Sequence, residues 1–170
     1  MHRVADSIPR IRVGKVPFVL TDLGNAVEAV IQAVRLGRGV PIRLSNAYCV
    51  ALASKDPEYC ALLNGDGLNF ADGSPIVWAM RIKNRAGGRP GRVRGPSLFR
   101  RTIDEGRRNH VRNFLLGTDE STLKLVKENL TARFPGVDIV GSYAPPYGPV
   151  DGSFLASCIS SVADTEANLV

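Results

Sequence analysis

Short apolar runs alternate with segments of helical periodicity along this 170-residue chain. Each run is only a few residues long and ends in glycine or a small polar residue, which is typical of a buried strand. The segments between the runs repeat apolar residues at three- and four-residue spacing, as in Leu23, Val27 and Val30. Strands that alternate with helices predict an α/β fold, with a Rossmann-like parallel sheet and helices on both faces.

Cap and turn residues divide the chain further. Residues 11–20 predict an edge strand or hairpin, and residues 21–170 predict the core of a single domain that spans residues 1–170. Short polar side chains or prolines open the expected helices, and glycines end them. Strands are expected at 40–44, 68–70, 111–116 and 137–141, and helices at 23–34, 46–54, 76–83, 96–109, 119–133 and 151–162, with a further helix from 57.

Composition excludes several classes of protein. A hydrophobic fraction of 44% indicates a globular chain. The three cysteines show no CxxC spacing and the two histidines lie far apart, so we expect no disulfide framework, no metal site and a reducing cytosol. Residues 1–20 lack the apolar core of a signal peptide, and no apolar run is long enough to span a membrane. We therefore expect a cytoplasmic protein.

The positive charge is local. Residues 81–112 contain 11 arginines and lysines against two acidic residues, while acidic residues outnumber basic ones in the rest of the chain. Such a segment can attract a phosphorylated small molecule, an anionic membrane surface or nucleic acid. The segment lacks the interleaved aromatic residues of a nucleic-acid platform, so we expect no nucleic-acid partner.

Ligands of parallel sheets bind beyond the carboxyl ends of the strands. At one such end, Asp72 can act as a general base or orient a substrate hydroxyl, and the adjacent Gly73 allows close approach of a ligand. The alternative for Asp72 is a turn or helix cap. At another end, Ser45 and Asn46 can contact a substrate through a hydroxyl and an amide, and the alternative for Asn46 is again a helix cap.

A basic turn follows about twenty residues after Asp72. Arg92, Arg94, Gly95 and Ser97 stand at the start of a predicted helix, where guanidinium groups and free backbone N–H groups can bind phosphate oxygens. The alternative is a solvated basic loop. We favour binding of an anion, because charge, glycines and a helix start coincide.

Two further segments are candidates for nucleotide contacts. Gly117 and Thr118 follow a strand and open a helix, so they can hold a ribose or phosphate, although an ordinary strand-to-helix turn also fits. Tyr143, in the proline-rich sequence YAPPY, can stack on a ligand or belong to a rigid turn. The absence of GxGxxG and GxxxxGK[ST] disfavours a nicotinamide oxidoreductase and a P-loop NTPase, so no cofactor is predicted.

An ordered set of short segments runs from Pro41 to Gly141. The segments are Asn46 with its helix, Lys55-Asp56-Pro57-Glu58, Leu62-Leu63-Asn64, Ala71-Asp72-Gly73, Ile76-Val77-Trp78, Arg92-Val93-Arg94-Gly95, Phe114-Leu115-Leu116-Gly117, and Phe134-Pro135-Gly136 with Ile139-Val140-Gly141. In this order, the set resembles the WecG/TagA/CpsF glycosyltransferase family.

This resemblance implies a Rossmann-like fold and an inverting, metal-independent glycosyltransferase of bacterial cell-surface polysaccharide synthesis. The implied reaction moves an N-acetylmannosamine-type or related sugar from a UDP-sugar to a polyprenyl-diphosphate-linked acceptor at the inner face of the membrane. Asp72 corresponds to the aspartate of the family's DG motif, a proposed catalytic base, and Asn46 to its strand-end asparagine. A homo-oligomer is also possible. The alternatives are a sugar-nucleotide-binding module without activity and, less favoured, a nucleic-acid-binding protein.

The sequence departs from the family's pattern in two places. Leu44-Ser45-Asn46 stands where the family often has Thr-Pro-Asn. Residues 167–170 resemble the start of a further strand, after which the family continues into a glycine-rich Gly-x-Gly-x-Pro-[Lys/Arg]-Gln-Glu segment of the nucleotide site. We therefore expect the sheet to be incomplete at the C-terminus.

Overall fold

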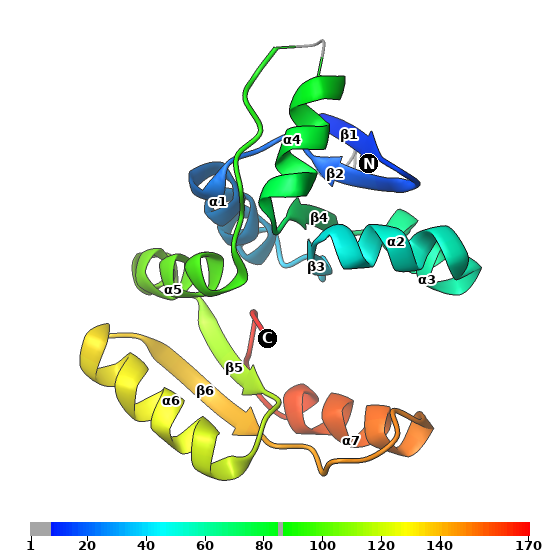
Figure 1. Cartoon of the computed structure of the whole chain (residues 1–170). Coiled ribbons are helices and arrows are strands. Elements are labelled where there is room, and N and C mark those ends of the chain that lie inside the picture. The colour runs from blue at the N-terminus through cyan, green and yellow to red at the C-terminus, as the bar shows by residue number, and fades with distance from the viewer. Residues whose placement is uncertain (1–7, 85–86) are drawn as a thin grey trace. The chain divides into compact units, whose positions relative to one another are not determined.

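The computed structural model describes residues 8–84 and 87–170. It has the predicted α/β fold, in which short parallel sheets are flanked by helices (Figure 1). The strands of the described residues pair two by two, in one antiparallel and two parallel sheets. The chain divides into two compact units, the first containing residues 8–33 and 38–100 of the described part and the second residues 34–37 and 101–170.

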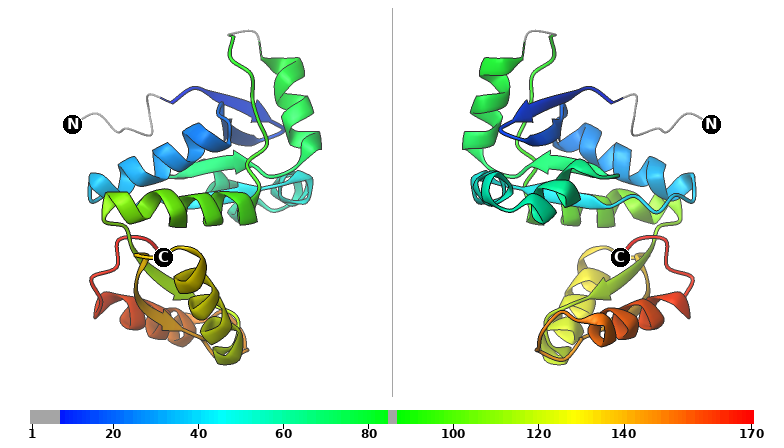
Figure 2. Two further views of the ribbon diagram at one scale, coloured as in Figure 1. Left: turned by 90° about the vertical axis from the view of Figure 1, so that its left-hand side faces the viewer. Right: turned by 90° about the vertical axis from the view of Figure 1, so that its right-hand side faces the viewer.

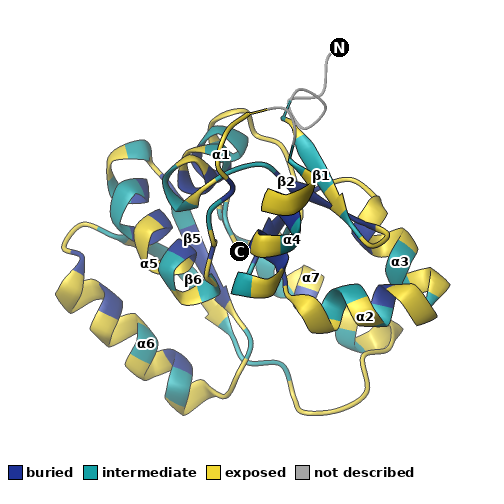
Figure 3. Cartoon of the chain, turned by 45° about the horizontal axis from the view of Figure 1, so that its top comes forward, coloured by how far each residue is buried: buried dark blue, intermediate teal, exposed yellow. Residues whose placement is uncertain are grey.

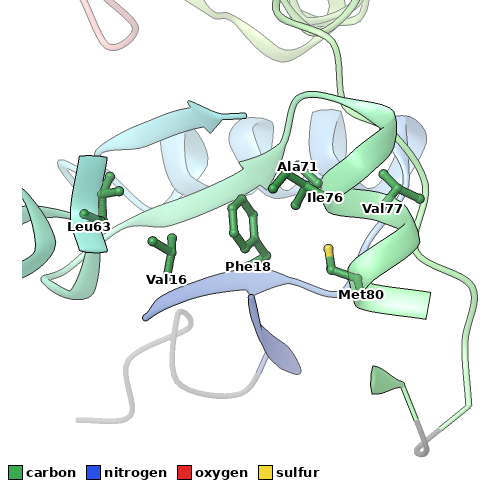
Figure 4. Close-up of a cluster of buried hydrophobic side chains, with 8 residues drawn as sticks. Val16, Phe18, Leu63, Ala71, Ile76, Val77 and Met80 are labelled. Carbon is green, nitrogen blue, oxygen red and sulfur yellow. The ribbon is translucent and has the colours of Figure 1, made fainter. Parts of the chain in front are cut away.

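The first unit begins with the predicted hairpin. Strand β1 (Arg10–Val13) pairs antiparallel with β2 (Val16–Val19), and Gly14 in the turn has a φ of +59°, which favours glycine. All of β2 is buried, whereas β1 is partly exposed. Val16 and Phe18 of β2 pack in an apolar cluster with side chains from four other elements (Figure 4). The hairpin therefore contributes directly to the core.

Helix α1 (Leu23–Arg35) follows β2. Its start is capped by Asp22, whose Oδ1 accepts the Asn25 N–H at 2.9 Å. It ends at Gly37, which has a φ of +59° and whose N–H donates to the Val34 carbonyl. Asp22 is thus the observed cap of this helix and Gly37 its observed stop.

Two parallel strands form the centre of the first unit. Strand β3 (Ile42–Ser45) pairs with β4 (Leu68–Ala71), with Ser45 opposite Ala71. Helices α2 (Ala47–Lys55) and α3 (Pro57–Asn64) connect them. Asn46 caps α2, which was the alternative interpretation of this residue, and Asp56 caps α3. Buried Asn69 on β4 donates to the carbonyls of Pro17 and Leu63, so it joins β4 to the hairpin and to α3.

Two helices complete the segment that follows β4. Helix α4 (Ser74–Lys83) packs Ile76, Val77 and Met80 against the hairpin (Figure 4). Helix α5 (Gly95–Gly106) is shorter than predicted, because its expected last turn forms a separate 3₁₀ turn, η2 (Arg107–Asn109). His110 then adopts a left-handed conformation with a φ of +54°, which ends the helical path.

The second unit contains β5 (Arg112–Leu116) and β6 (Asp138–Tyr143) as a parallel pair. Helices α6 (Glu120–Arg133) and α7 (Gly152–Ala163) lie on opposite sides of this pair (Figures 1 and 2). The core of the unit is formed by Ile103, Leu115, Leu123, Leu130 and Phe134.

The predicted start of a further strand at residues 167–170 is observed. Leu169 forms a parallel bridge with Asn113 of β5. The Leu169 carbonyl accepts the Phe114 N–H at 2.8 Å, and the Leu169 N–H donates to the Arg112 carbonyl at 3.1 Å. This segment therefore lies along β5, which also pairs with β6.

Among the described residues, no helix is both long enough and apolar enough to cross a membrane.

Candidate functional site

The carboxyl ends of β3 and β4 lie side by side. Because Ser45 is paired with Ala71, the next residues along each strand, Asn46 and Asp72, follow at the same edge of the sheet. The Asp72 N–H donates to the Ser45 carbonyl at 3.0 Å, and a Cβ atom built on Gly73 would lie 3.9 Å from the Cβ of Asn46. The structure thus brings together the two strand-end sites of the first unit.

The basic loop returns to this edge. The Val93 N–H donates to the Ala71 carbonyl at 2.9 Å, in the manner of a strand pairing beside β4. Val93 is fully buried, whereas its neighbours Arg92 and Arg94 are exposed. Since side chains alternate along an extended segment, the anchored Val93 turns both guanidinium groups away from the core. Neither arginine side chain has a hydrogen bond or ion pair with another described residue.

The Asp72 carboxylate points toward the start of α5. Its Oδ2 accepts the Gly95 N–H at 3.4 Å, and a Cβ on Gly95 would lie 3.8 Å from the same oxygen. Asp72 is half-buried, and no basic side chain of the described residues forms an ion pair with it. A carboxylate with one long hydrogen bond and partial access to solvent retains the free lone pairs that a proton acceptor needs.

Asn46 fills the helix-cap role that the sequence left open. Its Oδ1 accepts the N–H groups of Tyr48 at 2.9 Å and Cys49 at 3.2 Å, at the start of α2. Its Nδ2 donates no hydrogen bond to any described residue, and the residue is exposed. The amide therefore holds its helix with the oxygen and presents two N–H donors at the strand edge.

The remaining predicted site residues of the first unit differ in how far solvent or a ligand can reach them. Gly73 has a φ of +148° and begins α4 without a side-chain cap, a conformation that favours glycine. Ser97 is half-buried in the first turn of α5, and its N–H donates to the Arg94 carbonyl at 3.1 Å. Ser45 is only 1% exposed, so its hydroxyl is shielded from solvent.

Gly117, Thr118 and Tyr143 meet in the second unit. The Gly117 N–H donates to the Tyr143 carbonyl at 3.0 Å, which joins the ends of β5 and β6. Thr118 has a φ of +54°, a conformation rare for a β-branched residue and strained by about 1–3 kcal/mol. Nothing in the sequence indicated this strain, which is a known mark of functional turns.

The next residue, Asp119, caps α6. Its carboxylate accepts hydrogen bonds from the Ser121 hydroxyl, the Thr122 N–H and the Thr122 hydroxyl. These bonds, led by that of Ser121, hold the pKa of the Asp119 carboxyl well below its ordinary range. The turn after β5 thus has a fixed negative charge beside Thr118, which disfavours a phosphate at this carboxylate.

Sequence reasoning missed two exposed apolar residues at the strand edge of the first unit. Tyr48 is 72% exposed in the first turn of α2, two residues after Asn46. Leu44 is partly exposed, and its Cδ1 would lie 3.3 Å from a Cβ on Gly95. One feature of the sequence indicated the presence of Tyr48 at this edge, namely its position two residues after Asn46, a possible helix cap.

A separate open hollow of about 420 Å³ lies in the first unit. It is lined by Arg12 and Lys15 of the hairpin and by residues of α2 and α3, and it contains none of the predicted site residues. In the described part of the chain, no three histidine, cysteine, aspartate or glutamate side chains gather as metal ligands would.

Comparison with protein-family models matches residues 11–170 to the family described as "Glycosyl transferase WecG/TagA/CpsF family". The match covers all but the first residue of the hairpin, both parallel strand pairs and both strand-end turns. The family consists of glycosyltransferases that act in cell-surface polysaccharide synthesis. Because the match extends over nearly the whole chain, the chain belongs to the WecG/TagA/CpsF glycosyltransferase family.

Proposed function

We propose that this chain transfers an N-acetylmannosamine-type or related hexosyl group from a UDP-sugar to a polyprenyl-diphosphate-linked acceptor, with inversion at the anomeric carbon. The observation that carries the proposal is the arrangement at the edge of β3 and β4. There the half-buried Asp72 carboxylate, the unused Asn46 amide donors and the exposed Arg92 and Arg94 belong to adjoining segments. A base beside a positive loop suits a hydroxyl nucleophile and a diphosphate leaving group.

Asp72 has the role of general base. Its carboxylate accepts the proton of the acceptor sugar's hydroxyl as the hydroxyl oxygen forms a bond to the anomeric carbon of the donor. The bond between that carbon and the UDP oxygen breaks on the opposite face, and UDP leaves with the electron pair. Attack opposite the leaving group inverts the configuration of the anomeric carbon.

The basic loop stabilises the leaving group. Negative charge grows on the diphosphate as its bond to the sugar breaks, and fixed cationic donors are most effective against charge that develops in the transition state. Arg92 and Arg94 supply guanidinium groups, and the first turn of α5, which includes Gly95 and Ser97, supplies the positive end of the helix.

The proposal assigns supporting roles to the other predicted residues. Asn46 orients a substrate hydroxyl through its Nδ2 group, and Gly73 allows the substrate to approach the backbone. For Gly117, Thr118 and Tyr143 of the second unit, a nucleotide contact stays a prediction. This assignment treats residues 1–170 as one glycosyltransferase domain, which the single family match over both units supports.

The proposed location is the inner face of the bacterial membrane, where a polyprenyl-linked acceptor resides. A lipid-linked substrate cannot diffuse through water, so the protein must approach the bilayer to reach it. The absence of acidic residues between Asp72 and Asp104, in the region of the proposed diphosphate site, supports an encounter with an anionic surface.

Calorimetry with UDP and UDP-N-acetylhexosamines tests the substrate class. With EDTA present, we expect binding that Arg94→Ala weakens about tenfold, because a charge-assisted hydrogen bond contributes about 1.5–3 kcal/mol. Arg38→Ala is the matched control, since Arg38 is exposed and precedes β3 at the opposite edge of the sheet. Equal weakening by both substitutions, or no binding by the folded chain, would contradict the assignment of the basic loop to the donor diphosphate.

A further inference from the structure

Helix α4 has two apolar faces. Ile76, Val77 and Met80 form the face that packs into the core (Figure 4). Pro75, Trp78 and Ile82 lie on the other side, since residues three, four or seven apart share a face when each residue turns the helix by about 100°. We call these three residues the α4 stripe.

The α4 stripe contains large apolar side chains that are mostly exposed to solvent. Trp78 is 61% exposed and Ile82 is 85% exposed, one turn apart, and Figure 3 shows the exposed side of α4 in yellow. Burial of either side chain would stabilise the protein, as burial of the apolar side chains on the core face of α4 already does. A neighbouring pair of this kind indicates a contact surface rather than scattered surface residues.

Basic side chains flank the α4 stripe. By the same helical geometry, Arg81 lies to one side of it and Lys83 to the other. The Arg81 guanidinium donates to the Pro90 carbonyl at 3.2 and 3.3 Å, and the Lys83 ammonium donates to the Arg12 carbonyl at 3.2 Å. One carbonyl leaves further donors on each group, so both charges are held in place while they remain able to bind an anion.

The surroundings of the α4 stripe carry charge of one sign. No acidic residue occurs between Asp72 and Asp104, which encloses all of α4 and the loop after it. An apolar centre within a basic rim therefore characterises this face of the first unit.

We infer that the α4 stripe is a contact surface for an anionic lipid bilayer. Tryptophan and aliphatic side chains enter the boundary between head groups and acyl chains, while flanking arginine and lysine groups reach lipid phosphates. This inference deepens the proposed function, because α4 starts directly after Asp72 and Gly73 and so places the proposed acceptor site next to a membrane-facing helix. Binding to vesicles does not depend on sugar transfer, so the two can fail separately.

Two other occupants fit less well. A second copy seated by two-fold symmetry would place the basic rim of one stripe against the same rim of the other, and like charges would repel. Nucleic acid favours several aromatic side chains for base stacking, whereas this stripe offers one aromatic residue beside proline and isoleucine.

Trp78 is the only tryptophan of the chain, so its fluorescence reports on the stripe directly. We expect its emission to shift to shorter wavelength when the full 170-residue chain meets vesicles of equal parts phosphatidylcholine and phosphatidylglycerol. Lipids brominated near the head-group end of the acyl chains should quench it. Phosphatidylcholine alone should give a much smaller shift, because it lacks the net negative charge. An unchanged spectrum with the anionic vesicles would overturn the inference.

Matched substitutions locate the contact. Ile82→Ser should weaken sedimentation with the anionic vesicles about tenfold, whereas Ile159→Ser, the same change at a 66% exposed position on α7, should leave it unchanged. Lys83→Gln should weaken it about fivefold. Circular dichroism checks that the variants fold. Equal loss for Ile82→Ser and Ile159→Ser would overturn the assignment to α4.

Further readouts separate the competing occupants. A blue shift without vesicles that grows with protein concentration would assign the stripe to a second copy and overturn the inference. A shift with single-stranded RNA or with UDP-sugar that matches the shift with vesicles would assign Trp78 to that ligand and also overturn it. Retained Trp78 quenching by brominated lipid in the Asp72→Asn variant would support it, independently of any transfer activity.

Discussion

At the scale of single residues, Asn46 combines a structural acceptor with a donor that the described residues leave unused. Serine is as good a helix cap as asparagine but lacks the amide N–H groups. We expect Asn46→Ser to change the free energy of unfolding by a few tenths of a kcal/mol at most, while transfer activity falls about tenfold or more through loss of a substrate hydrogen bond.

Asn46→Ala is the companion variant. It removes the cap as well as the donor, so it should cost about 1 kcal/mol in the free energy of unfolding in addition to the loss of activity. Chemical denaturation and transfer assays on both variants measure the two effects. Full activity in the folded serine variant would show that Asn46 acts only as a cap.

Asp119 gives a prediction of pH dependence. Its pKa in the folded chain lies below the ordinary value of 3.8, chiefly because of the Ser121 hydroxyl and then the Thr122 N–H. A lowered folded pKa means that the ionised cap stabilises the fold above the ordinary pKa, and that this stabilisation is lost as the pH falls through the folded pKa. NMR titration of the Asp119 carboxyl carbon should find the low value, and Ser121→Ala should raise it. An ordinary pKa in the unmodified chain would refute the cap geometry.

Single residues also mark what the sequence could and could not predict. Asn46, Asp56, Asp119 and Asp151 were all expected at helix starts and all accept N–H groups there, because capping is a local interaction of short side chains. The bond from the Gly95 N–H to Asp72 joins residues 23 positions apart. No local pattern encodes such a distance, so the site was predicted as separate parts.

At the scale of elements, the start of α5 determines the space beside Asp72. A methyl group on Gly95 would lie 3.3 Å from the Leu44 side chain and 3.8 Å from the Asp72 Oδ2. Leu44 is partly exposed and can move, so we expect Gly95→Ala to fold with nearly unchanged stability. The same methyl group should narrow the space beside the Asp72 carboxylate, which is the proposed position of the acceptor hydroxyl. We therefore expect it to raise the KM for the lipid-linked acceptor several-fold.

Gly152→Ala is the matched control for this prediction. Gly152 is also the first residue of its helix, α7, but no atom lies within 4 Å of a Cβ built there. We expect this variant to keep the unmodified KM. Steady-state kinetics and thermal unfolding on both alanine variants provide the comparison, and an equal KM in Gly95→Ala and the unmodified chain would exclude Gly95 from the acceptor position.

The elements themselves were largely predictable, whereas their pairing was not. Hydrophobic periodicity located the strands and helices because burial acts within each segment. It placed the end of α5 at Asn109, although Gly106 ends the helix and a 3₁₀ turn follows. It also left open how the parallel strands pair, because β3 and β4, like β5 and β6, are distant in sequence, whereas the predicted hairpin joins adjacent strands.

At the scale of the whole molecule, the two units have separate apolar cores, and each contains a candidate site at the ends of its parallel strands. Val16, Phe18 and Met80 belong to the first core, and Leu115 and Phe134 to the second. The composition, which fits a single globular domain, gave no sign of this division. The family match runs through both units.

The central claim is that Asp72 is the base of an inverting sugar transfer. Single-turnover transfer from a UDP-sugar to a lipid-diphosphate-linked acceptor, measured on the unmodified chain and on Asp72→Asn, tests it most directly. We expect the substitution to lower the rate by about 10²–10⁴-fold, while the calorimetric affinity for UDP stays nearly unchanged. Full transfer activity in a folded Asp72→Asn protein would contradict the claim.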